Sequence, residues 1–404
     1  MTALYNFALF LLLLVSLPKL LFDYVIKKKY RKSFLARLFP QCPTPHKKPL
    51  IWLHSVSMGE TKALSTLVPH IRKTHPNAFI YVTTGTETGQ EEAKKRIKEA
   101  DGIGYLPFDF SWIMKKMVRK LQPALLILIE GDFWLNLIKE TKKRGGKVFL
   151  ANGKLSEKSL KRHLAAPFFS RPLFSAIDHF FLQSDLYQQR FLKLGVPPEK
   201  LTVTGNLKFD IPPPPLADLP RLQKKYRLAE NDRIITLGST HEGEESLLIQ
   251  VLLPLLDEDP HLKILVVPRH PERFASVKEK ICHPQIRVVD EMGILPACYK
   301  LSYLAIVGGS FVTHVGGHDI FEPVKLGVPT LYGPYMYGQV DLDKKLTASG
   351  AGKKVTKETL PQEIRSFLRD PSLHQSMAQK GKELAQTVMG ASLRTWNHIS
   401  LADN

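Results

Sequence analysis

Short polar segments follow apolar, β-branched runs along the chain, and these segments hold the residues that could do chemistry. In the first half they are HSVSMGE at 54–60, EGDFWLN at 130–136, ANGKLS at 151–156 and TGNLKFD at 204–210. Glu60 is the first candidate for a general base, because a carboxylate at the end of a strand can accept a proton from a hydroxyl group. The alternative is that Glu60 only caps a helix that begins near Thr61, where the helix dipole favours a negative charge.

The other segments of the first half combine carboxylates with lysines. Glu130 and Asp132 follow a strongly apolar run, and Lys154 and Lys208 follow two later runs. A lysine in a cleft can neutralise negative charge that develops during phosphate chemistry, although a single lysine is more often a solvated surface residue. Trp134 lies in the same segment as Glu130, and a lone tryptophan is more typical of packing.

The second half contains three such segments, GSTHEGEE at 238–245, PRHPER at 268–273 and GGSFVTHVGGHDIFEP at 308–323. The first one opens a helix, so its backbone N–H groups could cradle an anion. The second one places Arg269 and His270 at the end of a predicted strand. The glycines of the third suit close contact with a phosphate or a ribose. No segment of the sequence matches the GxGxxG or GxxxxGK[ST] fingerprint, which disfavours a dehydrogenase or an NTPase.

The elements that position these segments alternate between short apolar runs and longer amphipathic stretches. The predicted strands lie at 50–55, 78–84, 124–130, 147–152 and 179–184 in the first half, and at 233–239, 263–269, 286–290, 303–309 and 329–333 in the second. This alternation predicts an α/β fold whose mostly parallel sheets are covered by helices on both faces. Ligands of such folds bind at the carboxyl ends of the strands, where the polar segments lie.

Four consecutive prolines, at 212–215, divide the chain, because they cannot continue a helix or a central strand and favour an extended spacer. We therefore predict two Rossmann-like domains, 33–211 and 217–385, which are joined by a hinge at 212–216 and face a central cleft. The stretch 386–404 is predicted to be helical. It either packs back on the first domain or forms a plain surface helix.

The positive charge is concentrated in the first half of the chain. The 57 Lys and Arg against 38 Asp and Glu give a net charge of +19. Residues 1–211 hold 34 basic and 16 acidic side chains, a net of +18, whereas residues 212–404 hold 23 and 22, a net of +1. The first half should therefore attract an anionic partner such as a membrane surface. The 3 cysteines lack the spacing of a disulfide framework or a zinc site and fit a reducing compartment.

The amino terminus predicts a membrane anchor with a basic flank over residues 1–32. Residues 3–26 are apolar apart from a few positions such as Lys19 and Asp23, which suits the roughly 20 residues that a membrane helix needs, and KKKYRK follows at 27–32. A signal peptide would carry its charges before the apolar run. Charges after the run put the rest of the chain on the cytoplasmic side of the membrane. An ordinary amphipathic helix of the core is the alternative, and the depth of insertion stays open.

Taken together, these segments resemble the 3-deoxy-D-manno-octulosonic acid (Kdo) transferases of lipopolysaccharide assembly. The resemblance extends from the anchor through HSVSMGE, TTGTETG at 83–89, EGDFWLN, NGKLS, TGNLKFD, STHEGEE, PRHPER and GGH with FEP. It implies the GT-B glycosyltransferase fold and the inverting transfer of one or more Kdo units from CMP-Kdo to the acylated disaccharide precursor of lipid A. It also implies Glu60 as the general base and Glu130 and Lys208 as stabilisers of the transition state.

The resemblance implies contacts with CMP from three segments of the second half. These are Pro268, Arg269 and His270, then Gly293, Ile294 and Leu295, and finally Asp319, Ile320, Phe321 and Glu322. The chain departs from the usual pattern of the family at Asp319, where asparagine is usual, at Ile294, where an acidic residue is common, and in EGDFW, which stands for ETELW. An acid beside a bound phosphate lowers the affinity for the donor. No metal-ligand cluster appears in the sequence, so we expect no cofactor and metal-independent transfer.

The expected partners are CMP-Kdo, the lipid A precursor and the anionic lipids of the inner membrane. Nucleic acid is not an expected partner, because the chain has no recognisable nucleic-acid module and no interleaved aromatic and basic stretches. The same architecture also suits a different enzyme, a transferase or an epimerase that acts on a UDP-sugar. Binding of CMP rather than UDP distinguishes the two.

Overall fold

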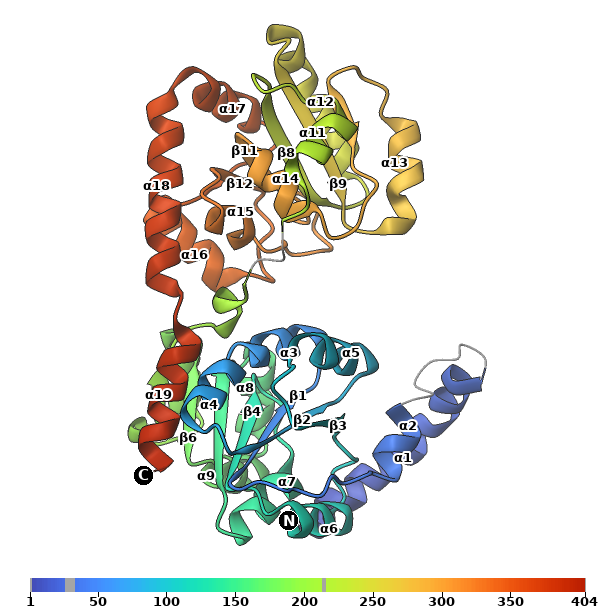
Figure 1. Cartoon of the computed structure of the whole chain (residues 1–404), viewed down its shortest axis with the longest axis vertical. Helices are drawn as coiled ribbons and strands as arrows, with labels where there is room; N and C mark the ends of the chain where they lie inside the picture. The colour runs from blue at the N-terminus through green and yellow to red at the C-terminus, as the bar shows by residue number, and fades with distance from the viewer. Residues whose placement is uncertain (1, 26–32, 213–215, 404) are drawn as a thin grey trace. The chain divides into compact units, whose positions relative to one another are not determined.

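The computed structural model describes residues 2–25, 33–212 and 216–403. It divides into two compact units, which are residues 1–211 together with 389–404 (unit 1) and residues 212–388 (unit 2) (Figure 1). The predicted basic flank at 27–32 and the central prolines of the hinge at 213–215 lie outside the described residues. The hinge at 212–216 and the cleft between the two domains therefore remain predictions from the sequence.

Unit 1 contains a seven-stranded parallel sheet with the order β3-β2-β1-β4-β5-β6-β7. Its strands are β1 Leu50–Ser55, β2 Phe79–Thr84, β3 Gly102–Tyr105, β4 Leu125–Ile129, β5 Lys147–Gly153, β6 His179–Leu182 and β7 Leu201–Val203. The central strands are continuous apolar runs, because helices cover both faces of the sheet. In the register of the sheet Leu53 lies opposite Val82 on one side and Ile127 on the other.

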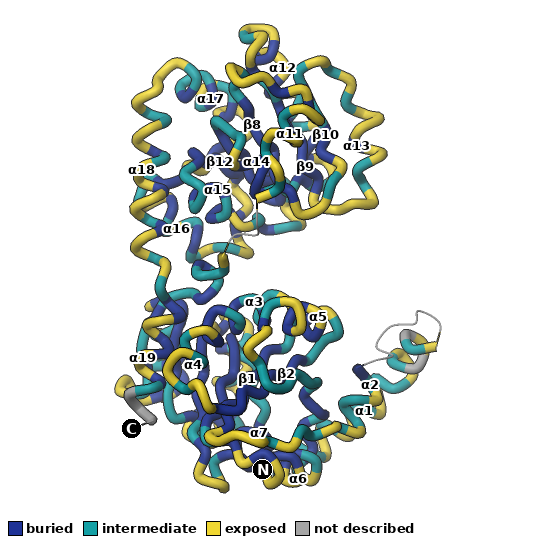
Figure 2. The backbone as a smooth tube through the Cα atoms, viewed as in Figure 1, coloured by how far each residue is buried: buried dark blue, intermediate teal, exposed yellow. Residues whose placement is uncertain are grey.

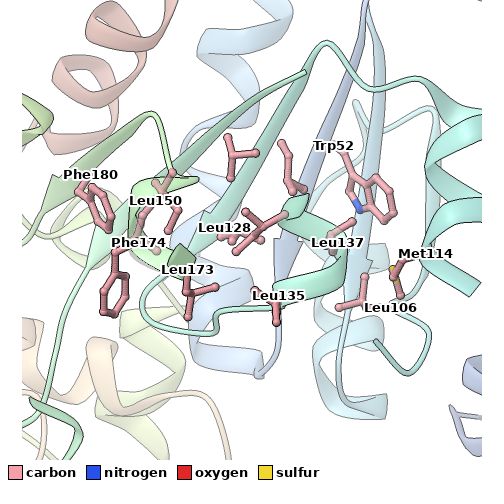
Figure 3. Close-up of a cluster of buried hydrophobic side chains, with 14 of the residues drawn as sticks. Trp52, Leu106, Met114, Leu128, Leu135, Leu137, Leu150, Leu173, Phe174 and Phe180 are labelled. Carbon is pink, nitrogen blue, oxygen red and sulfur yellow. The ribbon is translucent and has the colours of Figure 1, made fainter. Parts of the chain in front are cut away.

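Two hydrophobic clusters, one on each face of this sheet, hold unit 1 together. The helices are α1 Thr2–Val25, α2 Ser33–Leu38, α3 Met58–Ser65, α4 Val68–Thr74, α5 Glu87–Arg96, α6 Ser111–Leu121, α7 Leu135–Lys143, α8 Glu157–Ala165, α9 Pro167–Ser175, α10 Asp185–Lys193 and α19 Ala391–Asp403, with short 3-10 turns at Pro198–Lys200 and Leu207–Asp210. Trp52, Met114 and Leu137 belong to the first cluster (Figure 3). Leu53, Leu64 and Trp396 belong to the second.

The last helix, α19, completes the core of unit 1 although it comes from the far end of the chain. Trp396 is buried in the second cluster, and its Nε1 donates to Thr74 Oγ1 at 2.8 Å. The carboxylate of Asp210 accepts from the backbone N–H groups of Gly390 and Ser392, at 2.6 Å each, and so fixes the start of the helix. A break at Gly390, which has φ +84°, separates α19 from the preceding helix, α18 Pro371–Val388.

Unit 2 contains a six-stranded parallel sheet with the order β10-β9-β8-β11-β12-β13. Its strands are β8 Arg233–Thr240, β9 Leu262–Pro268, β10 Ile286–Val288, β11 Leu304–Val307, β12 Thr330–Tyr332 and β13 Lys353–Lys354. Its helices are α11 Leu219–Tyr226, α12 Glu244–Glu258, α13 Phe274–Lys280, α14 Leu295–Leu301, α15 Phe321–Lys325, α16 Val340–Ser349, α17 Leu360–Arg369 and α18 Pro371–Val388, with a 3-10 turn at Pro271–Arg273. The prediction of two Rossmann-like domains with parallel sheets is therefore confirmed.

Helix α1 lies on the outside of unit 1 (Figure 2). Leu12 and Val15 are 65% and 77% exposed, so α1 is not the buried core helix that was the alternative. Its stretch Thr2–Leu20 is long and apolar enough to cross a membrane by length and composition. The first turns are fixed to unit 1 by polar contacts, since Tyr5 Oη donates to Asp109 Oδ2 at 3.0 Å.

Candidate functional site

The polar segments of unit 1 gather at one edge of its sheet. Glu60 follows β1, Glu130 follows β4, Lys154 follows β5 and Lys208 follows β7. All these strands are parallel, so their carboxyl ends lie at the same edge. We call Glu60, Glu130, Asp132, Lys154 and Lys208 the carboxylate–lysine cluster.

Glu130 is the buried centre of this cluster. Its side chain is 4% exposed and forms ion pairs with two lysines, Lys208 at 2.6 Å and Lys154. The amide of Asn152 also donates to Glu130 Oε1, at 3.4 Å. Burial by itself raises the pKa of Glu130, but the two lysine charges and their hydrogen bonds outweigh it and lower the pKa. Glu130 is therefore a carboxylate in the folded protein.

The backbone around Glu130 is held in an unusual conformation. Glu130 has φ +68° and Asn152 has φ +56°, values that few residues other than glycine adopt. Glu130 N donates to Ala151 O, and Lys154 N donates to Glu130 O, both at 3.0 Å. These bonds tie the ends of β4 and β5 together and turn the side chains of Glu130 and Lys154 toward each other. Strain of this kind is found where the surrounding structure must place a functional group.

Glu60 lies in the first turn of α3, which begins at Met58 and so slightly earlier than the sequence predicts. Its Oε2 accepts from Val56 N–H at 2.7 Å, and its Oε1 accepts from Ser57 Oγ at 2.8 Å. The capping role that was the alternative for Glu60 is thus present. It does not exclude the chemical role, because Glu60 is only half-buried and its orientation is fixed.

Asp132 lies close enough to Glu60 for the two carboxyl groups to interact electrostatically. Two carboxyl groups in contact cannot both ionise easily. Burial, followed by the neighbouring Glu60 carboxylate, raises the pKa of Asp132 to about 7. The cluster therefore combines Asp132, whose pKa is raised, with the buried carboxylate of Glu130, which is neutralised by two lysines.

His54 and Trp134 support the cluster from inside the domain. His54 is buried, and its Nδ1 lies 3.0 Å from Thr83 Oγ1. Burial lowers the pKa of His54 to about 3, so the ring is neutral. Trp134 packs against it edge to face, with 5.9 Å between ring centroids. Within residues 2–25, 33–212 and 216–403, His54 Nε2 and Trp134 Nε1 have no hydrogen-bond partner.

The TTGTETG segment surrounds the loop that carries Glu60. Thr86 Oγ1 donates to Val56 O at 2.9 Å, and a Cβ at Gly85 would come within 2.8 Å of the Val56 side chain. The glycine and threonine at these positions therefore have a packing explanation. They fix the backbone whose N–H group holds the Glu60 carboxylate.

The segments of unit 2 also gather at the carboxyl edge of their sheet. His241 follows β8, Arg269 and His270 follow β9, Gly293 follows β10, and the glycine-rich segment 308–318 follows β11. Arg269 and His270 are exposed. Arg269 N donates to Thr240 O at 3.0 Å, which fixes the start of the PRHPER segment against the end of β8.

The structure divides the predicted nucleotide contacts into two kinds. The side chains of Ile294, Ile320 and Phe321 are buried in the interior of unit 2, so only their backbone could contact a ligand. Asp319 is exposed, and its Oδ1 accepts from Phe321 N at 2.9 Å. The carboxylate of Asp319 is thus used to hold the start of α15.

A histidine pair in unit 2 was not predicted from the sequence. His241 Nε2 and His318 Nε2 lie 2.7 Å apart, and the two rings are stacked. Both belong to segments that follow strands, β8 and β11, which are neighbours in the sheet. That adjacency is the signal that could have paired them. In the part of the chain that the structure describes, no group of three or more His, Cys, Asp or Glu is arranged to hold a metal ion.

Comparisons with known proteins identify the family. The family model of 3-deoxy-D-manno-octulosonic-acid transferase (kdotransferase) matches residues 31–211, and the model of UDP-glucoronosyl and UDP-glucosyl transferase matches residues 307–377. The chain is 33% identical to a 3-deoxy-D-manno-octulosonic acid transferase of Chlamydia pneumoniae over 98% of this chain and 95% of that one. It is 30% identical to the transferase of that name from Haemophilus influenzae, over 87% and 86% of the two chains.

Solved structures agree with the fold. A glycosyltransferase from Rickettsia africae matches with a TM-score of 0.63 and 16% identity, covering 88% of this chain and 97% of that one. A putative UDP-N-acetylglucosamine 2-epimerase from Listeria monocytogenes matches with a TM-score of 0.62 and 14% identity, covering 87% and 97%. The two Rossmann-like units thus form a glycosyltransferase fold of the GT-B type. With relatives at 30% identity and above over nearly its whole length, the chain belongs to the family of 3-deoxy-D-manno-octulosonic acid transferases.

Proposed function

We propose that this Kdo transferase uses CMP-Kdo as its donor and the acylated disaccharide precursor of lipid A as its acceptor, and that it adds one or more Kdo units with inversion at the anomeric carbon. Family membership supports the transfer of Kdo. The observation that carries the residue assignment is the carboxylate–lysine cluster, which unites Glu60, Glu130 and Lys208 at one sheet edge. These are the three positions that match the family motifs.

Glu60 acts in this proposal as the general base. It removes the proton from the acceptor hydroxyl while that oxygen attacks the anomeric carbon of Kdo, and CMP leaves with the electron pair of the bond that breaks. A general base must be oriented before the reaction. The hydrogen bonds from Val56 N–H and Ser57 Oγ supply that orientation.

Glu130 and Lys208 stabilise the charges that develop. Lys208 is about one-third exposed at 37%, so its ammonium group can contact both the buried Glu130 and a substrate. A positioned cation in a cleft is effective because it needs no reorganisation when negative charge appears. Glu130 keeps the ammonium group in place through the ion pair at 2.6 Å.

The donor is bound in this proposal by unit 2, through the Arg269 and His270 side chains and the backbone of the segments around Gly293 and Asp319–Glu322. Exposed cationic groups at the carboxyl edge of a parallel sheet suit a nucleotide phosphate. We further propose that transfer needs neither a metal ion nor a cofactor.

Helix α1 anchors the enzyme to the bacterial inner membrane, with both units on the cytoplasmic side. Its exposed apolar surface continues onto Phe168, which is 69% exposed and lines an apolar groove with Leu4 and Ala8. Trp112, at the start of α6, is also exposed. Tryptophan at this kind of position suits the boundary between lipid and water. The net charge of +18 in residues 1–211 favours anionic lipid and a phosphorylated acceptor.

A transfer assay with products resolved by mass tests the proposal. The protein in detergent receives CMP-Kdo generated in place and the lipid A precursor, and we expect the acceptor to gain the mass of one or more Kdo units. Release of CMP without a mass gain would contradict the acceptor assignment. Binding of UDP in preference to CMP, with no transfer of Kdo, would contradict the donor assignment and favour a UDP-sugar enzyme.

A further inference from the structure

The contact between His241 and His318 is the feature of unit 2 that the proposed function does not use. We propose that the two histidines form a proton-sharing pair that binds the phosphate of the cytidine nucleotide, and that the pair takes up a proton from solvent when the nucleotide binds. This inference rests on the proposed CMP site and adds to it two ligand residues and a protonation step.

The geometry of the pair requires a proton between the rings. The two Nε2 atoms lie 2.7 Å apart, which is hydrogen-bond distance, so one nitrogen donates and the other accepts. The rings are stacked with an interplanar angle of 13°, and the His270 ring meets that of His241 edge to face, with 5.2 Å between centroids. A second proton turns one of the two rings into an imidazolium, whose positive charge and remaining N–H group then favour an anionic acceptor beside the pair.

The protein holds the pair through the loops after β8 and β11. Glu244 is fully buried, and its carboxylate accepts from His241 N at 2.9 Å, Gly309 N at 2.7 Å and Phe311 N at 2.9 Å. Gly309 has φ +68°, and a Cβ there would come within 2.7 Å of the His318 ring. The glycine therefore leaves the space that His318 occupies. The glycine-rich segment positions this histidine as well as allowing close approach of a ligand.

The side chains around the pair are mostly basic. Arg269 and His270 act on His318, and His270, Arg273 and His314 act on His241. The carboxylates nearby are already used, because Glu245 forms an ion pair with Arg273 at 2.8 Å and Glu244 holds the three backbone N–H groups. Arg269 is then the cation among these groups whose charge is not matched by Glu244 or Glu245, and it favours an anion beside the pair.

The same surroundings explain why a proton would enter with the ligand. Burial, followed by the neighbouring His241, Arg269 and His270, lowers the pKa of His318 to about 4, and burial and the neighbouring cations also lower the pKa of His241. The pair therefore lacks its second proton at neutral pH in the free protein. A phosphate group reverses the sign of the local field and raises these pKa values, so protonation and binding favour each other.

Calorimetric titration of the full chain in detergent with CMP tests the proposal. Titrations at one pH in two buffers of different ionisation enthalpy give the number of protons taken up on binding. At pH 7.5, where a phosphate monoester is mostly dianionic, we expect net proton uptake by the wild-type protein. We also expect the affinity for CMP to rise as the pH falls from 8 to 6.5, by up to about ten-fold per pH unit. Cytidine, which lacks the phosphate, is expected to bind without proton uptake.

Two variants and a matched control complete the test. His318→Gln and His241→Gln are expected to abolish the uptake and to weaken CMP binding about ten-fold. His261→Gln is expected to behave like the wild type, because His261 precedes β9 at the opposite end of the strand. CMP binding by the wild-type protein without proton uptake would overturn the proton-sharing pair while leaving the proposed function intact. A protein that does not bind CMP at all would overturn the CMP site itself.

Discussion

The two units handle charge in opposite ways at the carboxyl edges of their sheets. In unit 1 the buried carboxylate of Glu130 is matched by Lys154 and Lys208, and burial together with the neighbouring Glu60 raises the pKa of Asp132. In unit 2 the His241–His318 pair lies among basic side chains, and the carboxylates of Glu244 and Glu245 are occupied. In the first site positive and negative charges are matched before any substrate binds. In the second site, as we propose, an anionic ligand supplies the negative charge.

This difference fits the separate tasks that we propose for the two units. A base and its stabilising groups work best when they are fixed in advance, because reorganisation during the reaction raises the barrier. The nucleotide must leave the site of unit 2 after each transfer. Release is easier when the extra positive charge of the histidine pair is present only while the nucleotide is bound. The comparison predicts that variants of the cluster in unit 1 change the rate of transfer, and variants of the pair in unit 2 change the affinity for CMP.

Replacement of the base should have the largest effect. Glu60→Gln keeps the shape of the side chain but cannot accept the proton, and we expect transfer to fall by about 10²- to 10⁴-fold. The affinity for CMP should not change, because Glu60 belongs to unit 1 and the donor site to unit 2. The mass-resolved transfer assay and calorimetry measure the two quantities. Glu157→Gln, an exposed carboxylate on α8, serves as the control. Near-normal transfer by Glu60→Gln would remove Glu60 from the chemistry.

Loss of one cation from the balanced site should be the next largest effect. Lys208→Met removes a positive charge but leaves Glu130 paired with Lys154, so we expect the protein to stay folded and transfer to fall by about 10²-fold. Thermal unfolding and the transfer rate separate these two effects. Lys193→Met, which changes an exposed lysine on α10, is the matched control. A variant that loses stability but keeps its transfer rate per folded molecule would make Lys208 a structural partner of Glu130 only.

The fold could be predicted from the sequence because its strands are buried on both faces and stand out as apolar runs. Three strands, β3, β7 and β13, were missed because they are short and lie near the sheet edges, where β3 contains two glycines and β13 consists of two exposed lysines. Glu60, Glu130 and Lys208 could be singled out because each lies in a distinctive polar segment at a strand end, and the structure brings them together, while their catalytic roles stay predictions. The histidine pair could not be found in this way, since it depends on which strands are neighbours and on the space that Gly309 leaves.

The acidic pair in unit 1 should make stability depend on pH. The pKa of Asp132 is raised to about 7 in the folded protein, above the value of about 4 for an unfolded chain. The folded state therefore binds more protons, and the stabilisation that is present below pH 4 is lost as the pH rises through 7. We expect Asp132→Asn to remove this loss and to be more stable than the wild type at pH 8, by at most about 2 kcal/mol, because Asp132 is partly exposed.

Denaturant unfolding of both proteins at pH 5 and pH 8 measures that effect. The difference in the free energy of unfolding between wild type and Asp132→Asn should change with pH, while Asp185→Asn, an exposed aspartate on α10, should show no such change. Parallel pH profiles for wild type and Asp132→Asn would show that folding does not raise the pKa of Asp132. Asp132 would then carry an unmatched negative charge, and the charges of the carboxylate–lysine cluster would not be balanced at this residue.

The smallest effect is expected at Asp319, an exposed acidic residue that directly follows His318 in the chain. Its Oδ1 accepts from Phe321 N at 2.9 Å, and asparagine can make the same hydrogen bond without the charge. Removing a negative charge near a site that attracts anions should strengthen CMP binding by about two- to five-fold, and less at high salt, because exposed charges are screened. Calorimetry of Asp319→Asn at two salt concentrations measures both quantities. An unchanged affinity would mean that Asp319 lies too far from the phosphate to oppose its binding, and attraction of the anion would then depend on the histidine pair and Arg269 without opposition from this carboxylate.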